Sequence, residues 1–243
     1  MQTYKIRPRE AAQEAISSYL KMQRLRPGDR LPSEREMSEL WAFNRCTLRS
    51  AVSRLERDGV LEVRRNSGIY MAQPKFVRSL QDLKSFTEET QHQGRQGSTR
   101  LLALEVVECD KQFSRRFQQI LGTPLWRLSR LRSVDGVPVQ IETSYLLRDR
   151  FPELDHFDLE RQSLFAILEE HYHAVPDQGD ETISITQANA AEAGLLELAD
   201  DAPVFRLVSQ TLDRSGELLE YCNTVARGDK LVLTSILKRR ELQ

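Results

Sequence analysis

No apolar run in the sequence approaches the ~18 residues that a helix needs to cross a bilayer. The chain begins with MQTYKIRPRE, which lacks the apolar stretch of a secretory signal peptide. These two absences argue against a membrane span and against secretion. We therefore expect a cytoplasmic protein that has no membrane partner.

Cysteine is scarce and scattered. The three cysteines, Cys46, Cys109 and Cys222, are far apart in the sequence, and no C-x-x-C pair occurs. Disulfide frameworks and zinc clusters need several cysteines at characteristic spacings, so the sequence argues against both. A lone cysteine usually fills part of a core or lies half-buried, and we assign no function to these three.

Common catalytic signatures are missing as well. The sequence contains no G-x-S-x-G, no P-loop and no G-x-G-x-x-G. Hydrolase chemistry of the α/β type, phosphotransfer and dinucleotide binding therefore have no support. His171 and His173 resemble a metal pair only superficially, because their spacing suits a strand whereas they end a helical pattern. We expect no metal and no cofactor.

Charge is abundant but unevenly distributed. Of the 243 residues, 40% are hydrophobic and 29% are charged, which fits a soluble chain with one large domain or two ordinary ones. Residues 1–78 hold 16 Lys and Arg against 9 Asp and Glu, the remainder holds 19 against 27, and the net charge is −1. A basic first third favours a nucleic-acid-binding module joined to a domain with another role. Chance clustering on solvated faces is the alternative.

The basic first third has the pattern of three helices. Pro8 suits a first helical turn, and apolar residues then recur at helical spacing from Ala12 to Leu20. In LPSEREMSELW, Ser33 and Glu36 have the S-x-x-E spacing of a capping box. This spacing predicts a second helix that begins at about Glu34 and ends near Trp41.

The third helix is predicted within FNRCTLRSAVSRLERDG, residues 43–59. Asn44 is a favourable N-cap, and the pair Asp58-Gly59 provides the stop. Apolar residues at i, i+3, i+4 and i+7 form its expected buried face: Leu48, Ala51, Val52 and Leu55.

Two arginines, Arg45 and Arg49, lie one turn apart in the N-terminal half of this third helix. The helix macrodipole disfavours positive charge there, so a purely structural role does not explain them. DNA brought to this end would meet free N–H groups and two guanidinium groups, and the major groove admits a helix. Thr47 lies between them and can contact a phosphate or a base. A solvated basic face is the alternative.

A hairpin follows the third helix. VLEVRRNSGIYMA, residues 60–72, consists of two short strand-like runs around a basic tip that contains Gly68. Three helices followed by such a hairpin form a winged helix-turn-helix, in which the hairpin can reach the DNA groove beside the third helix.

This segment resembles the DNA-binding domain of the GntR family of bacterial transcription regulators over about residues 10–72. The family run L-P-S-E-R-x-L-A is similar to LPSEREMS, and S-R-x-T-V-R-x-A-L is similar to NRCTLRSAV, with asparagine where serine is usual. Because one recognition helix covers only a few base pairs, we expect a homodimer on a double-stranded, pseudo-palindromic DNA operator, and the family resemblance implies that residues 85–243 carry the dimer contacts. The candidate DNA contacts are Arg35, Asn44, Arg45, Thr47, Arg49 and Gly68.

The rest of the chain has another character. We expect residues 1–73 to form the DNA-binding domain, residues 74–84 a linker and residues 85–243 a second domain. In the second domain, short strands with hairpin turns are broken by helices, which predicts an α+β fold with a mostly antiparallel sheet. One helix is expected in residues 110–122, and its inward residues are Phe113, Phe117, Ile120 and Leu121.

Two arginines share a face with apolar residues in a strand pair predicted within residues 125–147. The residues of this face are Trp126, Leu128, Arg130, Arg132 and Val134. Burying a guanidinium group without a counter-anion is costly, so acidic residues or a bound anion should meet the arginines unless this face is open to solvent. A three-residue loop would place Glu142 opposite Arg130, and a two-residue loop would place it opposite Ser129.

The second domain resembles the UTRA ligand-binding domain of the HutC subgroup of GntR regulators, which has the chorismate-lyase fold, over about residues 85–237. The motifs that carry this resemblance are SFTEE, RLR, PVQIE, SLF, DAPVFRL and RGDK. In members that sense phosphorylated sugars, the matching arginines and serine hold the phosphate, and the glutamate meets sugar hydroxyls. The candidate effector contacts are Thr87, Arg130, Arg132, Glu142, Ser163 and Phe165, where phenylalanine replaces the usual tyrosine.

The sequence therefore predicts a ligand-responsive DNA-binding regulator. We expect a repressor that is released from its operator by a small anionic metabolite, such as a sugar phosphate or a related acid, and that is not an enzyme. The alternative is a lyase-like enzyme, because the second domain resembles a lyase and inward arginines with a glutamate could be catalytic. Release of pyruvate from chorismate would distinguish the two.

Overall fold

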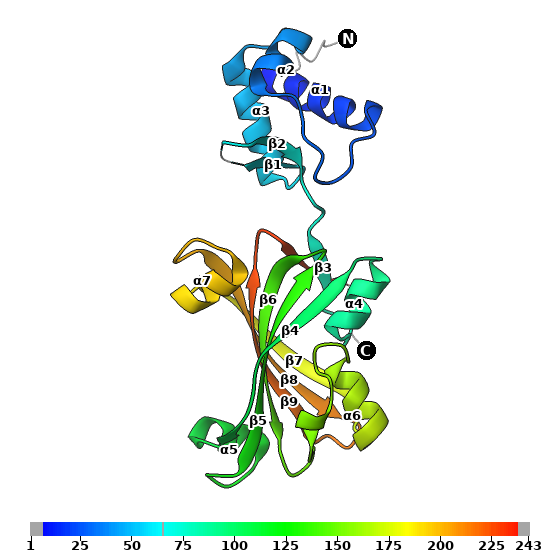
Figure 1. Ribbon diagram of the computed structural model, residues 1–243, viewed down its shortest axis with the longest axis vertical. Helices are drawn as coiled ribbons and strands as arrows, with labels where there is room; N and C mark the ends of the chain where they lie inside the picture. Colours follow the sequence, from blue (N-terminus) through cyan, green and yellow to red (C-terminus); the bar gives the residue numbers. More distant parts are fainter. Residues whose placement is uncertain (1–6, 65, 238–243) are drawn as a thin grey trace, which may run out of the picture. The chain divides into compact units, whose positions relative to one another are not determined.

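The computed structural model describes residues 7–64 and 66–237. The chain divides into two compact units, Met1–Lys75 and Phe76–Gln243, and Figure 1 labels the elements of both. The first is called the N-terminal unit and the second the C-terminal unit. The N-terminal unit contains three helices and a hairpin: α1 (Pro8–Met22), α2 (Glu34–Trp41), α3 (Arg45–Arg57), β1 (Leu61–Arg64) and β2 (Gly68–Met71).

Local sequence signals set the helices of the N-terminal unit. At the start of α2, the Ser33 side chain accepts a hydrogen bond from the Glu36 backbone N–H, and the Glu36 carboxylate accepts one from the Ser33 N–H. The predicted capping box and both ends of this helix are confirmed. Asn44 caps α3 by accepting a hydrogen bond from the Thr47 backbone N–H over 2.8 Å. The predicted apolar face of α3 is buried in the core of this unit: Leu48, Ala51, Val52 and Leu55.

The hairpin β1–β2 pairs antiparallel, with Arg64 opposite Gly68. Arg65, at the predicted basic tip, lies outside the described residues. Gly68 begins β2 with φ of +138°, and a Cβ atom there would lie 3.0 Å from Nε of Arg30. Backbone conformation and close approach therefore both favour glycine at this position.

The C-terminal unit is an α+β fold, as predicted. Its main sheet has the strand order β4-β5-β6-β9-β8-β7, and all neighbouring strands are antiparallel. The strands of this sheet are β4 (Gly97–Glu108), β5 (Pro124–Val134), β6 (Val137–Leu147), β7 (Pro176–Gln187), β8 (Pro203–Asp213) and β9 (Leu218–Arg227). The remaining elements are β3 (Phe76–Ser79), α4 (Phe86–His92), α5 (Lys111–Phe117), η1 (Leu154–His156), α6 (Leu164–Tyr172), α7 (Ala190–Leu196) and β10 (Leu231–Thr234).

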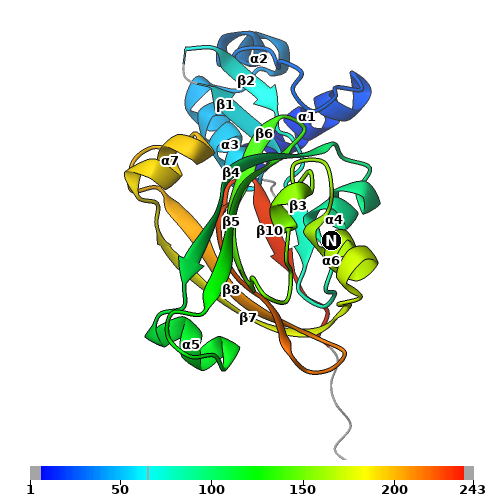
Figure 2. The same cartoon turned by 60° about the horizontal axis from the view of Figure 1, so that its bottom comes forward.

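The helices lie on different sides of this sheet. Figures 1 and 2 both show α4 and α6 on one side, and α5 and α7 on the other. The parallel pair β3–β10 forms a second, two-stranded sheet. Buried side chains from the main sheet, α6 and η1 form one of the apolar clusters of this unit.

The segment expected to be a linker contains a strand, which corrects the prediction for part of residues 74–84. Phe76–Ser79 form β3 and pair with β10. Phe76 is buried and packs edge-on against Phe86, with ring centroids 5.6 Å apart. The Gln93 side chain also bonds to the backbone N–H and carbonyl of Val77. An apolar contact and strand pairing therefore fix the start of this segment to the C-terminal unit.

The predicted helix in residues 110–122 is shorter than expected. It ends at Phe117, because Gln118 adopts a left-handed conformation and turns the chain out of the helix. Ile120 and Leu121, which were expected to face inward, are instead 80% and 58% exposed. The apolar pattern of the sequence extends past the end of α5, so its last two residues lie outside the helix and are not buried by it.

The hairpin β5–β6 resolves the open question of register. Its turn consists of the two residues Asp135 and Gly136, and a bulge at Val139 adds one residue to β6. The bulge restores the pairing that a three-residue loop would have given, so Glu142 lies opposite Arg130.

A close approach positions α4 on the main sheet. A Cβ atom at Gly97, the first residue of β4, would lie 2.6 Å from Oγ1 of Thr90, which is buried on α4. Gly97→Ala is expected to destabilise the C-terminal unit by about 1–3 kcal/mol, because a buried side chain must shift. The matched control is Gly194→Ala in α7, where a Cβ would meet nothing within 4 Å. That change is expected to raise stability by about 0.5–1 kcal/mol, since alanine is the better helix former. Urea unfolding measures both, and equal stability of the two variants would contradict the assignment.

Candidate functional site

A cavity of about 490 Å³ opens within the C-terminal unit. Strands of the main sheet form one wall, and α4, the start of α6 and the segment from Arg78 to Phe86 form the others. Five of the six predicted effector contacts line it: Arg130, Arg132, Glu142, Ser163 and Phe165. The structure therefore brings residues from β5, β6 and α6 to one place.

Arg130 and Arg132 share one carboxylate at the base of the cavity. Nη2 of Arg130 donates to Oε2 of Glu142 over 3.2 Å, and Nε of Arg132 donates to the same oxygen over 2.7 Å. Gln140 donates to the other oxygen of Glu142 over 2.7 Å. Arg132 also donates to the Thr99 hydroxyl. Glu142 is thus held by its neighbours with both oxygens engaged.

Both arginines are buried, with Arg130 2% and Arg132 4% exposed. The alternative that their face is open to solvent is therefore wrong. Burial, followed by the charge of Arg132, lowers the pKa of Arg130 to about 10. Burial acts to raise the pKa of Glu142, but Arg132 and Arg130 outweigh it and hold this pKa at about 2. Both charged forms persist at neutral pH.

The hydrogen-bonding capacity of Arg130 is not used up. Its Nε and Nη1 are buried and have no hydrogen-bond partner among the described residues. An unsatisfied buried donor costs about 1–3 kcal/mol, and more when the group is charged. An acceptor that entered the cavity would remove this penalty, which points to an anion as the ligand.

Ser163 and Phe165 lie at the N-terminal end of α6. Ser163 occupies the N-cap position, but its side chain makes no capping hydrogen bond. Its hydroxyl and the first N–H groups of α6 are therefore free to bind a ligand, and the helix dipole favours a negative one. Phe165 is half-buried beside them.

Thr87 is the predicted contact that the structure does not place in the cavity lining. It lies on α4, whose lining residues are Phe86 and Glu89. The Arg132 guanidinium lies 5.1 Å from the centre of the Phe86 ring. Phe86 and Glu89 both belong to the motif SFTEE. The helical spacing of α4 orients these two residues, rather than Thr87, toward the cavity.

Sequence reasoning missed four charged side chains that line the cavity in buried or half-buried positions. These are Arg78, Glu89, Glu181 and Glu220. Alternation along β9 was the available signal for one of them, because Glu220, Cys222 and Thr224 have the same parity and all three line the cavity. The others come from segments whose proximity only the folded chain defines.

Glu89 is expected to make stability depend on pH. Burial raises the pKa of Glu89 from 4.5 to about 7. Between these values the folded protein keeps the proton while the unfolded chain releases it, so the free energy of unfolding falls as pH rises. Relative to Glu89→Gln, the wild type should lose at most about 3 kcal/mol between pH 4.5 and pH 7. Urea unfolding at several pH values measures this difference, which would be constant if Glu89 ionised normally.

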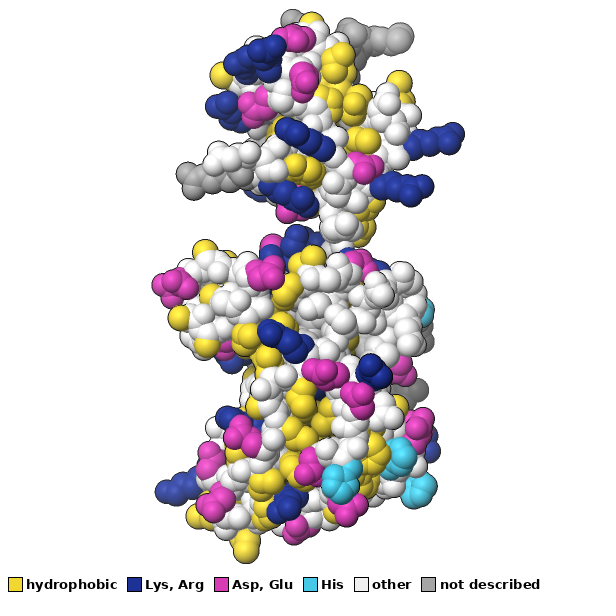
Figure 3. All heavy atoms as spheres, in the orientation of Figure 1, with side chains coloured by type: hydrophobic (Ala, Val, Ile, Leu, Met, Phe, Trp, Pro, Cys, Tyr) yellow, Lys and Arg dark blue, Asp and Glu magenta, His cyan; other side chains and the backbone are white. Residues whose placement is uncertain are grey.

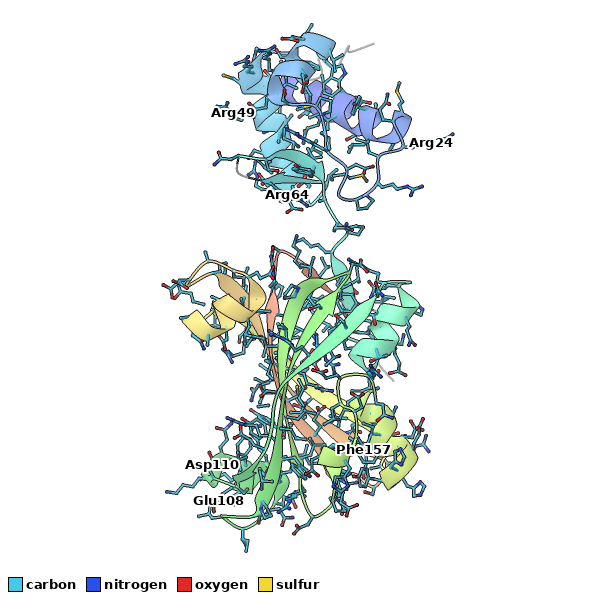
Figure 4. All side chains as sticks on the ribbon, viewed as in Figure 1. Arg24, Arg49, Arg64, Glu108, Asp110 and Phe157 are labelled. Carbon is cyan, nitrogen blue, oxygen red and sulfur yellow. The ribbon has the colours of Figure 1, made fainter. Side chains whose placement is uncertain are left out.

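The N-terminal unit presents the predicted DNA contacts at its surface. Arg45 and Arg49 are exposed on α3, and Figure 4 labels Arg49. Nη2 of Arg49 pairs with Oε2 of Glu34 at the start of α2 over 3.1 Å, which orients its guanidinium. Arg45 has no ion-pair partner among residues 7–64 and 66–237.

The other predicted contacts surround these two arginines or lie on the hairpin. Arg35 is exposed on α2 and pairs with Glu39 over 3.3 Å. The Asn44 amide oxygen is engaged in capping α3, and Thr47 is half-buried in the first turn. Gly68 lies at the start of β2. Figure 3 shows Lys and Arg side chains on the visible face of the N-terminal unit, and frequent Asp and Glu side chains on that of the C-terminal unit.

The described part of the chain contains no group of three or more His, Cys, Asp and Glu side chains placed to hold a metal ion. Its helices are all too short or too polar to span a bilayer.

Comparison with known families identifies both units. The sequence matches the bacterial regulatory proteins of the gntR family over residues 8–71 and the UTRA domain over residues 92–231. The chain belongs to the gntR family. Its N-terminal unit carries the helix-turn-helix of this DNA-binding family, and its C-terminal unit is a UTRA domain, in agreement with the resemblances seen in the sequence.

Two relatives of this gntR-family chain are named as transcriptional repressors. The HTH-type transcriptional repressor NagR of Bacillus subtilis is 28% identical over 93% of each chain. The HTH-type transcriptional repressor PhnF of Mycolicibacterium smegmatis is 32% identical over 88% of this chain and 86% of its own. The crystal structure of PhnF from Mycobacterium smegmatis has a TM-score of 0.70 and covers 94% of this chain and 100% of the PhnF chain.

Proposed function

We propose that this protein is a repressor that leaves its DNA operator when a small anion, a sugar phosphate or a related acid, binds in the cavity of the UTRA domain. The observation that supports an anionic ligand is the pair of buried donors on Arg130 that have no hydrogen-bond partner among the described residues. The Ser163 hydroxyl and the N-terminus of α6 provide further donors at the same cavity. The names of the relatives favour a regulator over a lyase-like enzyme.

For DNA binding, we propose that α3 enters the major groove. In helix-turn-helix proteins, residues at the N-terminal end of the recognition helix contact base edges. Arg45, Thr47 and Arg49 occupy this end of α3 and are partly or fully exposed. Arg35, Asn44 and the hairpin with Gly68 are positioned as supporting contacts to the DNA backbone.

The link between cavity and DNA-binding unit is short in the sequence. β3 begins directly after Lys75, the last residue of the N-terminal unit, and Arg78 on β3 already lines the cavity. Arg78 pairs with Glu181 of β7 over 2.8 Å. A ligand that changes the position of β3 therefore acts on the segment that leads to the DNA-binding unit.

The repressor is proposed to be a homodimer on a pseudo-palindromic operator, because one recognition helix reads only a few base pairs. Sedimentation equilibrium of the full chain at micromolar concentration should give twice the mass of 28.1 kDa. The operator selected from random duplex DNA should contain two inverted half-sites. A monomer bound to a single half-site would contradict this part of the proposal.

A ligand screen tests the effector class. Thermal unfolding is measured with inorganic phosphate, sugar phosphates, small carboxylic acids and their uncharged analogues, because a ligand that binds only the folded state raises its stability. Anions should raise the unfolding temperature, and the same anions should weaken binding to the selected operator. An uncharged effector would contradict the anion site.

A further inference from the structure

The buried and half-buried charged residues of the cavity include more acids than bases, whereas a simple anion site would have an excess of positive charge. The buried and half-buried lining of the cavity contains three arginines and four glutamates: Arg78, Arg130, Arg132, Glu89, Glu142, Glu181 and Glu220. With every group ionised, the protein itself carries one excess negative charge there. A plain dianion that bound beside the arginines would add to this excess next to buried charged groups.

The excess negative charge can be assigned to particular groups. Glu142 is shared by Arg130 and Arg132, and Glu181 pairs with Arg78. Glu220 is 6% exposed on β9, where burial raises the pKa of its carboxyl and the charge of Arg130 acts in the opposite direction. Glu89 is the remaining acid, on the opposite wall formed by α4.

The Glu89 carboxylate is the most unusual group of the cavity. The residue Glu89 is 7% exposed, yet its carboxylate has no hydrogen-bond or ion-pair partner among the described residues. The charges that act on it, including those of Arg78 and Glu142, belong to other lining residues. The fully buried unpaired atoms of the described residues include Nε and Nη1 of Arg130 but no oxygen of Glu89, so the Glu89 carboxylate is accessible from the cavity that it lines. The cavity lining therefore contains buried donors without an acceptor on Arg130 and an accessible carboxylate without a donor on Glu89.

We infer that the effector is zwitterionic: its anionic group binds Arg130, and a cationic group such as an ammonium binds Glu89. This inference deepens the proposed function and rests on it. One ligand of this class provides a partner for both groups, because its anion accepts hydrogen bonds from the free donors of Arg130 and its cation donates to the Glu89 carboxylate. It also enters the cavity without adding to the excess of negative charge.

Burial of Glu89 has a second consequence that the experiment must separate. Since burial raises the pKa of Glu89 to about 7, a protonated Glu89 is the competing account, in which the group offers a hydroxyl to a neutral ligand atom. At about pH 8 the carboxyl is mostly ionised, and alkyl ammonium groups keep their proton. The measurement is therefore made at about pH 8.

The test compares matched ligands that differ only in the cation. Isothermal titration of the full-length protein uses ω-aminoalkyl phosphates and the corresponding alkyl phosphates, from ethyl to pentyl. A parallel series uses ω-amino carboxylic acids and plain carboxylic acids. At the chain length that spans the cavity, the amino compound is expected to bind about 10-fold or more tightly than its plain counterpart.

Two variants test whether the tighter binding of the amino compounds depends on Glu89. In Glu89→Gln, the ratio of the two affinities should fall to about one, because the neutral amide offers no charge to the ammonium. Glu170→Gln, a matched change at an exposed position of α6, should keep the wild-type ratio. Loss of the ratio in both variants, or in neither, would overturn the assignment to Glu89.

The possible outcomes separate this inference from the proposed function. If plain and amino compounds bind equally at every length, the cationic subsite is wrong, although the anion site stands. If no compound of either series binds, the anionic effector itself is contradicted and the inference falls with it. Tighter binding of the amino compounds that persists in Glu89→Gln would place the cation elsewhere and contradict the proposal.

Discussion

Arg45→Ala is expected to reduce the preference of the protein for its operator over random duplex DNA by about 5- to 150-fold, while the fold remains intact. A bidentate arginine contact to a guanine edge contributes about 1–3 kcal/mol of discrimination. Arg45 is exposed on the first turn of α3 and has no ion-pair partner in the described part of the chain, so its removal leaves no buried charge behind. Fluorescence anisotropy with the selected operator and with random DNA measures the ratio.

The matched control is Arg54→Ala on the same helix. Arg54 lies in the C-terminal half of α3, where it pairs with Asp58 over 3.0 Å. Its loss should leave the ratio within about two-fold of wild type, because the N-terminal residues of such a recognition helix are the ones that contact base edges. For Arg45→Ala, residual binding to random DNA should weaken further as salt rises, since phosphate contacts release counterions. An unchanged preference in Arg45→Ala would exclude Arg45 as a base contact.

The DNA-binding unit could be predicted almost completely because its signals are local. The capping box of Ser33 and Glu36, the N-cap of Asn44 and the apolar stripe from Leu48 to Leu55 act within one helix each. Each of them determines where a helix begins or which face it buries, whatever the rest of the chain does. The hairpin was also predicted, with Arg65 at its tip outside the described residues.

The cavity that we propose as the effector site could be predicted only in part, because it depends on register and on distant segments. Alternation along β5 placed Arg130 and Arg132 on one face, but the bulge at Val139 decided that Glu142 lies opposite Arg130. Composition and spacing do not encode such a bulge. The meeting of Glu89 on α4 with residues of β5 and β6 depends on the packing of α4 against the main sheet.

Arg130→Ala is expected to abolish the response of DNA binding to the effector. In the wild type, a coupling of about 1–3 kcal/mol would change operator affinity by about 5- to 150-fold when the effector binds. Removing the guanidinium takes away the donors that receive the anion, so the ratio of operator affinities with and without ligand should fall to about one. Operator titrations with saturating wild-type effector measure this ratio. A variant that still responds like the wild type would exclude Arg130 from the site.

A second variant controls for the possibility that Arg130→Ala loses its response because it unfolds. Arg130→Ala leaves Glu142 paired with Arg132 alone and opens space in a buried region, so unfolding of the variant must be measured in parallel. Ser163→Ala removes a hydroxyl that makes no capping hydrogen bond, and it should cost little stability. It is expected to weaken effector binding by about 10- to 150-fold through the loss of one hydrogen bond to a charged group. A full response in both variants would place the effector outside this cavity.

The most direct measurement of the central claim is the affinity of the effector for the free protein and for the protein saturated with operator DNA. A repressor that releases DNA when the cavity is filled must bind its effector more weakly on DNA, by the same factor by which the effector weakens DNA binding. Isothermal titration should therefore show an affinity lower by about 5- to 150-fold in the presence of the operator. Equal effector affinities with and without operator DNA would contradict the coupling between the cavity and the DNA-binding unit.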